Sequence, residues 1–470
     1  MSNVVSGRID FVRRKSALLA VSVVALSLLG GPAAAESLSD ALVKAYQSNP
    51  QLNAERARQR GTDENVPQAL AGYRPQIVAN LSAGLQAVRN LLPGNVVQGA
   101  TLRPWTIGVT VTQVLFNGFK TANSVRVAEF QVQSGREALR NVAQGVLLDA
   151  VTAYMDVIAN DALFAAQQTN VAVLREILAT THRRLDAGDV TPTDLAQAEA
   201  RLNRGLADLN AADVTLAISK ATYTQVIGEP PSRLLPAVTV DRLSPDGLAA
   251  ATEAAGHEHP AVVAAGFDVD VARTSISVAE SSLLPTVTAQ AGVSRSKESD
   301  PTLSTFGTDQ ASVVGQIDVP IYDGGTAASQ TRQAKEVASQ SRLVLEQVRR
   351  QTRTAVASAW VTNEGTKVAL TAAESEVRAA DVALQGVRRE AQGGQRTTID
   401  VLNAQQDLTN ARSRLIQAQH DRVIASYTLL SAVGRLDVHT LNLNTPDYLP
   451  EIHYHQVRDA WHGVRTPSGQ

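Results

Sequence analysis

Two similar stretches, RRLDAGDVTPTDLAQA at residues 183–198 and REAQGGQRTTIDVLNA at residues 389–404, decide the fold. Each lies between two long segments whose apolar residues have helical spacing. Glycine can adopt the left-handed backbone that ends a helix, and threonine can cap the next helix. We therefore expect the chain to reverse at both places, with Thr397 or Thr398 as the second cap.

The two stretches are copies within a duplicated chain. Gly188 aligns with Gly394, and Asp194 aligns with Asp400, each 206 residues later. The same offset relates three further pairs of matching residues. They are Leu115 and Ile321 at a strand end, Tyr154 and Trp360 in mid-helix, and Gly228 and Gly434 at the end of each half. One offset that relates positions so far apart indicates an internal repeat.

Each repeat is predicted to contain a helix, a β-hairpin and a long helical hairpin. The first repeat covers 36–235 with its tip at 187–192, and the second covers 236–436 with its tip at 393–397. A polar tail, 437–470, follows. Solvated side chains are the default expectation in such a tail, and they are expected there for His453, Tyr454 and His455.

The periodicity predicts both helices and strands. Residues 37–72 have helical spacing that Asn49-Pro50 interrupts, and 119–186 and 193–227 predict helices of about 100 Å and 50 Å. The period changes to two after Tyr73-Arg74-Pro75, which gives an apolar face of Ile77, Ala79, Leu81, Ala83 and Leu85. After a loop with Pro93-Gly94, the pattern returns at Trp105, Ile107, Val109, Val111 and Leu115, and the second repeat shows it at Val287, Ala289, Ala291 and Val293.

The N-terminus has the features of an export signal. Arg13-Arg14-Lys15 precedes an apolar run of about 13 residues, too short for a membrane span, and Ala33-Ala34-Ala35 offers a cleavage site. We expect residues 1–35 to be removed as a signal peptide. No later segment is expected to be a transmembrane helix, so any membrane insertion must use β-strands, and a soluble sandwich could show the same alternation.

Composition excludes several classes of function. The chain has no cysteine and only 4% aromatic residues, so disulfides and thiolate chemistry are absent. Removal of 1–35 changes the net charge from −2 to about −5, which argues against a nucleic-acid partner. His257-Glu258-His259 is a poor metal motif because i and i+2 do not share a helix face, and Gly324-Gly325 lacks the Lys of a phosphate loop. No enzyme motif and no cofactor are expected.

A long helix, a glycine turn and then Thr-x-Asp-Val-Leu-x-Ala resembles the TolC family of outer-membrane channel proteins, over about residues 37–436. The resemblance implies a mainly α fold with a membrane β-barrel, in which a homotrimer forms twelve strands on an α-helical periplasmic tunnel. It also implies outer-membrane lipid around the barrel, a periplasmic adaptor and an inner-membrane ABC or proton-driven pump as partners. The tail around Tyr448–Trp461 resembles members that serve type I protein secretion.

The resemblance also implies roles for single residues. Asp400 would form a carboxylate ring at the periplasmic constriction, where Asn403 replaces a second acid of many members. Arg396 and Asp194 match positions of closing links between helix pairs, and Ala391 stands where a tyrosine often joins them. The alternative is that Asp400 and Asp194 only complement their helix dipoles.

The tips and one aromatic residue complete the candidate sites. The tips would dock an adaptor's coiled coil, at Gly188, Val190, Gly394 and Thr397. Trp105 is a candidate for the membrane interface, or an ordinary strand aromatic. The main alternative function is a soluble periplasmic coiled-coil scaffold or adaptor. A secreted enzyme with helical decoration is remote, since no catalytic constellation is recognisable.

Overall fold

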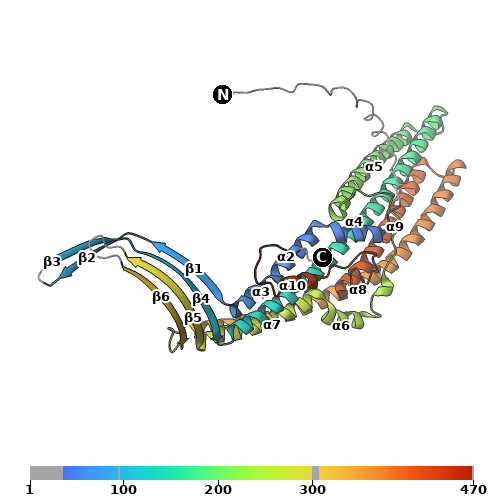
Figure 1. The fold of residues 1–470 in the computed structure, drawn as a ribbon. Coiled ribbons are helices and arrows are strands. Elements are labelled where there is room, and N and C mark those ends of the chain that lie inside the picture. Colours follow the sequence, from blue (N-terminus) through green and yellow to red (C-terminus); the bar gives the residue numbers. More distant parts are fainter. Residues whose placement is uncertain (1–34, 94–95, 299–305, 468–470) are drawn as a thin grey trace, which may run out of the picture.

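The computed structural model describes residues 35–93, 96–298 and 306–467. A long curved sheet extends from one end of a helical body, and the tips of two long helical hairpins lie at the opposite end (Figure 1). Gly94 and, apart from Ala35, the predicted signal peptide lie outside the described residues.

Two helical hairpins of equal dimensions dominate the fold. They are α4 (Lys120–Asp186) with α5 (Pro192–Ile227), and α8 (Thr326–Gln392) with α9 (Thr398–Val433). The first helix of each pair has 67 residues and the second has 36. At 1.5 Å per residue, α4 and α8 are about 100 Å long, as the sequence predicts.

Shorter helices precede each sheet hairpin. They are α1 (Leu38–Ser48), α2 (Pro50–Asp63), α3 (Asn65–Leu70) and the 3₁₀ turn η1 (Ala71–Tyr73) in the first half, and η2 (Asp241–Leu243), α6 (Leu248–Glu258), α7 (Pro260–Glu280) and η3 (Ser281–Leu283) in the second. The interruption predicted at Asn49-Pro50 is confirmed. A second break after Asp63 was not predicted. Pro67 accounts for it, because in an unbroken helix its ring would clash with the carbonyl of Asp63, to which it has no N–H to donate.

The strands form one large sheet and one extra hairpin. The sheet order is β1-β4-β5-β6, all antiparallel, with β1 (Gln76–Ala83), β4 (Trp105–Asn117), β5 (Thr286–Glu298) and β6 (Phe306–Asp318). Where we expected a loop, β2 (Gln86–Leu92) pairs with β3 (Val96–Leu102) as a separate ladder. That hairpin extends beyond the sheet in Figure 1.

The main core lies where the middle of α4 meets α1, the ends of α5 and α9, and the linker between the halves. Tyr154 is fully buried there. Its hydroxyl lies 2.9 Å from the carbonyl oxygen of Glu36 and 2.7 Å from that of Leu235. The Tyr154 side chain therefore holds both the residue that precedes the cap of α1 and the inter-repeat linker against α4.

One window of 18 residues within α4 is long and apolar enough to cross a membrane, although the sequence analysis expected none. More than half of that window, 56%, is buried inside the chain. Because helices of the same chain cover it, packing accounts for its hydropathy.

The C-terminal segment differs from the solvated tail that was expected. It forms α10 (Pro450–Val457), which packs on α2. His453 is fully buried, and its Nδ1 lies 2.9 Å from Oδ2 of the equally buried Asp63. Tyr454 is partly buried beneath the guanidinium of Arg136, and only His455 is exposed as expected. The prediction failed because the partners of this helix lie more than 300 residues earlier in the chain.

Replacing His453 by leucine should release α10 from α2. The substitution leaves the Asp63 carboxylate buried without its ring partner, a change that typically costs about 3–5 kcal/mol. Hydrogen exchange of α10 should accelerate by about 10²-fold or more. The matched control is His455→Leu on the same helix, which should exchange like the unchanged chain. Equal protection in both variants would contradict the anchoring role of the buried pair.

Candidate functional site

The two hairpin turns have the same construction. Gly188 and Gly394 have φ values of +81° and +75°, in the left-handed region that the turn requires. Thr191 caps α5, and Thr397, rather than Thr398, caps α9. Val190 is partly exposed beside the first turn.

Asp194 and Asp400 each complete a capping box. Oδ2 of Asp400 accepts hydrogen bonds from the backbone N (3.0 Å) and Oγ1 (2.7 Å) of Thr397. Asp194 makes the same bonds to Thr191, at 2.9 Å and 2.7 Å. The backbone hydrogen bond is the main cause that lowers the pKa of each carboxyl below 3.8. Both side chains are therefore partly exposed anions at the tip as well as caps.

Arg396 and Asn403 bond to different parts of the tip. Nε of Arg396 lies 2.9 Å from Oε2 of Glu390, so the arginine is paired across its own turn. Oδ1 of Asn403 accepts from the guanidinium of Arg201 at 2.9 Å, which joins α9 to α5. Of the four predicted gate residues, Asp400 and Arg396 share one turn, Asn403 lies one helical turn further on, and Asp194 lies on the other hairpin.

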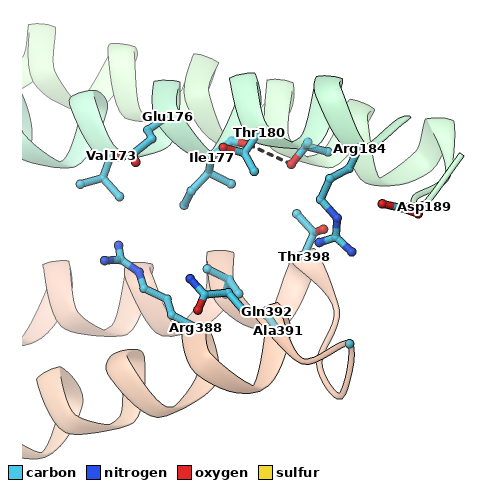
Figure 2. A pocket seen from close by; sticks show the side chains of 13 residues that line it. Val173, Glu176, Ile177, Thr180, Arg184, Asp189, Arg388, Ala391, Gln392 and Thr398 are labelled. Atoms are coloured by element: carbon cyan, nitrogen blue, oxygen red, sulfur yellow. Dashed lines mark hydrogen bonds between the residues drawn. The ribbon is translucent and has the colours of Figure 1, made fainter. Parts of the chain in front are cut away.

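A cleft of about 550 Å³ separates the two tips (Figure 2). From α4 it is lined by Val173, Glu176, Ile177 and Arg184, and across the cleft by Arg388 and Gln392 of α8. Ala391 also lines it. Because alanine stands where a tyrosine often occurs in the resembled family, the cleft is wider at this point than a tyrosine would leave it.

The strand register places most apolar positions on one face of the sheet. One row across the four strands is Ala79, Val109, Val293 and Ala311, and the next is Ile77, Val111, Ala291 and Val313. The opposite face has rows of Asn80, Gly108, Ser294 and Gln310, and of Val78, Thr110, Gly292 and Ser312. Within this chain the apolar face is largely exposed, for example 68% at Ile77 and 84% at Val313.

Trp105 lies at the end of this apolar face. It is opposite Ala83 on β1 and Lys297 on β5, and the next apolar-face row contains Ile107, Arg295 and Asp309. The change from aliphatic to charged side chains occurs within one row. This position is typical of an interfacial tryptophan.

An exposed valine stripe follows α8, at Val337, Val344, Val361, Val368 and Val382. Val337 and Val344 are seven residues apart, as are Val361 and Val368, and Val382 lies two heptads beyond Val368. The step from Val344 to Val361 is two heptads plus the three residues that separate positions a and d. Val361 is two residues from each of the buried Ala359 and Asn363, so it is nearly opposite the side that packs within the chain. The helix α5 exposes Leu206, Val214 and Ile218 in a similar way.

The weaker motifs have local structural roles. His259 caps α7 through Nδ1, which accepts from the N–H of Ala261, and Glu258 pairs with Arg435. The described residues contain no group of His, Cys, Asp and Glu that could hold a metal ion. The glycines at 324 and 325 precede α8, and the Asp323 carboxylate accepts hydrogen bonds from the backbone N–H groups of Gly325 and Ala327.

Sequence reasoning missed the valine stripe and the charged residues Arg201 and Arg388 of the tips. The stripe had a signal, namely valine at heptad spacing on a helix otherwise rich in polar residues. No sequence signal marked Arg201, because its partner Asn403 is 202 residues away.

Comparison with known proteins agrees with this geometry. The family model for outer membrane efflux proteins matches residues 41–229 and 252–435. The chain is 40% identical to the outer membrane efflux protein BepC of Brucella suis, with 94% of this chain and 95% of that protein covered. It is 24% identical to the alkaline protease secretion protein AprF of Pseudomonas aeruginosa, with 90% of each covered.

A solved structure shows the same fold. The CmeC outer membrane channel of Campylobacter jejuni superposes with a TM-score of 0.76 at 13% identity, over 90% of this chain and 89% of that one. The two halves that the family model matches contain both helical hairpins and both halves of the main sheet. The chain belongs to the outer membrane efflux protein family, as its resemblance to TolC indicates.

Proposed function

We propose that this chain is the outer-membrane exit duct of a tripartite efflux or type I secretion system, and that it conducts substrates passively. The observation that carries the proposal is the four-stranded sheet with one aligned apolar face and an opposite face that is mainly polar. Such a sheet fits lipid on one side and water on the other. The long helical hairpins would extend the duct into the periplasm.

A homotrimer completes the proposed barrel. Four strands cannot close alone, and three copies give twelve strands with a real lumen. The valine stripe of α8 supports this assembly, since its apolar side chains need a partner that the single chain does not provide. A neighbouring copy offers the exposed apolar residues of α5.

The native mass of the detergent-extracted protein, measured after the outer membrane is separated from the periplasm, tests the proposal. A trimer in the outer membrane is expected. A monomer released with the periplasm would instead favour the second candidate, a soluble coiled-coil scaffold, for which the long exposed helices are the supporting observation.

The hairpin tips are the proposed docking surface for a periplasmic adaptor, which would connect the duct to an inner-membrane pump. The cleft between the tips supports this role, because it exposes Val173 and Ile177 between charged residues. A partner helix of the adaptor could insert its apolar positions there. The energy for transport would come from the pump.

Asp400 is proposed to form the carboxylate ring of the constriction. Asp400→Asn retains a capping oxygen but removes three charges per trimer, so block by multivalent cations in planar bilayers should weaken by about tenfold or more. Because the pKa is below 3.8, block of the unchanged channel should persist at about pH 5 and fail only as pH falls through that lowered value. The Asp194→Asn variant changes the identical capping box of the first turn, so its block tests whether Asp194 also contributes to the ring. Unaltered block in Asp400→Asn would remove Asp400 from the pore.

A further inference from the structure

Polar contacts join the two hairpins along the seam between α4 and α9. Near the tips, the buried side chains of Gln405 and Thr409 bond to Asn170, at 3.3 Å and 3.1 Å. Further from the tips, Nε2 of His420 lies 2.9 Å from Oδ1 of Asp156. Of these contacts, only the last contains a group that changes charge near neutral pH.

Both ring nitrogens of His420 face carboxylates. Nδ1 lies 2.8 Å from Oδ1 of Asp421, on the same helix, while Nε2 faces Asp156 on α4. The His420 side chain is only 12% exposed. A neutral imidazole has one N–H, so either tautomer would point a lone pair at a carboxylate, whereas the imidazolium donates to both. Only the imidazolium can donate to both carboxylates, so the geometry favours the charged ring.

The surroundings contain no competing cation for these carboxylates within the described residues. The amide nitrogen of Gln417, which is neutral, lies 2.8 Å from Oδ1 of Asp421 and 3.3 Å from Nδ1 of His420. The adjacent Arg422 faces away, toward Asp241 of the inter-repeat linker and Asn363 of α8. The charged groups in contact with His420 are thus one acid from each hairpin.

We propose that His420, Asp156 and Asp421 form a proton-dependent bridge that holds the two hairpins of one chain together at acidic pH and releases them at alkaline pH. We call these three residues the His420 bridge. Release weakens the seam between α4 and α9, so the two tips separate more easily. The proposal extends the proposed duct function by giving its periplasmic end a response to pH.

The direction of the response follows from the protonation of the ring. Burial lowers the pKa of His420, but hydrogen bonds to Asp156 and Asp421 raise it, and the net shift is upward from 6.5. A raised pKa means that the bridge contributes its full stability below about pH 6.5 and loses it as pH rises through the folded-state value.

Spin labels on the two tips test the proposal. The chain has no cysteine, so Ala187→Cys and Gln395→Cys, both in exposed turns, place one label on each hairpin. The labelled full chain is diluted with unlabelled chain in detergent, and the distance distribution is measured at about pH 5.5 and about pH 8.5. The distribution should shift to longer distances, or broaden toward them, at the higher pH.

The His420→Gln variant should lose this pH response, and the matched control His182→Gln should keep it. His182 also pairs with an acid, Asp186, but both lie on α4, so this pair does not join the hairpins. A wild-type distribution that is the same at both pH values, or a response that persists in His420→Gln, would overturn the proposal. These measurements do not depend on conduction or membrane location, so failure of the duct function would appear separately, in the native mass.

Discussion

Substitution of Val361 and Val368 by lysine should abolish assembly and leave the chain as a monomer. Both valines are among the exposed members of the α8 stripe, 67% and 72% exposed in the single chain. In the proposed trimer they lie between copies, so the double variant buries two ammonium groups at each of three interfaces. Each unpaired buried charge costs several kcal/mol, which exceeds what the remaining contacts of a helix stripe can offset. Native mass of the extracted protein measures the result.

The control for this variant must change the charge equally without touching the stripe. Glu374→Lys alters the net charge by the same two units as the double valine variant, and Glu374 is exposed on α8 away from the stripe. This variant should remain trimeric. If both variants assemble normally, the stripe is not the contact between copies, and it faces the water-filled interior or another protein.

Proline at the tip glycines should abolish export while leaving a trimer in the outer membrane. Gly188 and Gly394 have positive φ, and proline is fixed near −65°. In addition, Gly394 donates its N–H to the carbonyl of Ala391 at 3.2 Å, a bond that proline cannot make. The turns must therefore rearrange, and with them both walls of the cleft that we propose for the adaptor. Secretion of a reporter cargo by the double variant should fall by about 10²-fold or more, as binding energy of a few kcal/mol is lost.

Asparagine at the same positions provides the comparison. It tolerates the left-handed conformation better than other side chains, and no atom lies within 4 Å of the space that a Cβ would occupy at either glycine. Gly188→Asn and Gly394→Asn should export nearly normally. Export by the proline variant at the level of the asparagine variant would reject the tips as the docking surface.

The sequence predicted the elements that depend on local patterns. Helix lengths, strand alternation and the Thr397 cap follow from residues within a few turns of each other, and the structure places them as expected. The break after Asp63 also has a local cause, Pro67, which the prediction for residues 37–72 did not take into account. The hairpin β2–β3 was missed because the alternation was read only in its flanking strands.

Contacts between distant segments could not be predicted in the same way. The pairs Asp63 with His453 and Asp156 with His420 join residues 390 and 264 positions apart. Nothing in the residues around either histidine indicates which acid it will meet, because that depends on how α10 and α9 pack on earlier helices. The candidate gate residues illustrate the same difference. The capping of α9 at the second turn could be predicted from nearby residues, whereas the contact of Arg201 with Asn403 could not.

The extra hairpin β2–β3 has a consequence for how a cell carrying this protein is recognised from outside. Within the residues that the structure describes, it occurs only in the first half of the chain, at the end of the sheet far from the helices (Figure 1). If the sheet spans the outer membrane, a trimer displays three copies of this hairpin around its external mouth. They would be the part of the protein most accessible to antibodies and bacteriophages, and the place where an epitope tag is tolerated without disturbing the transport path.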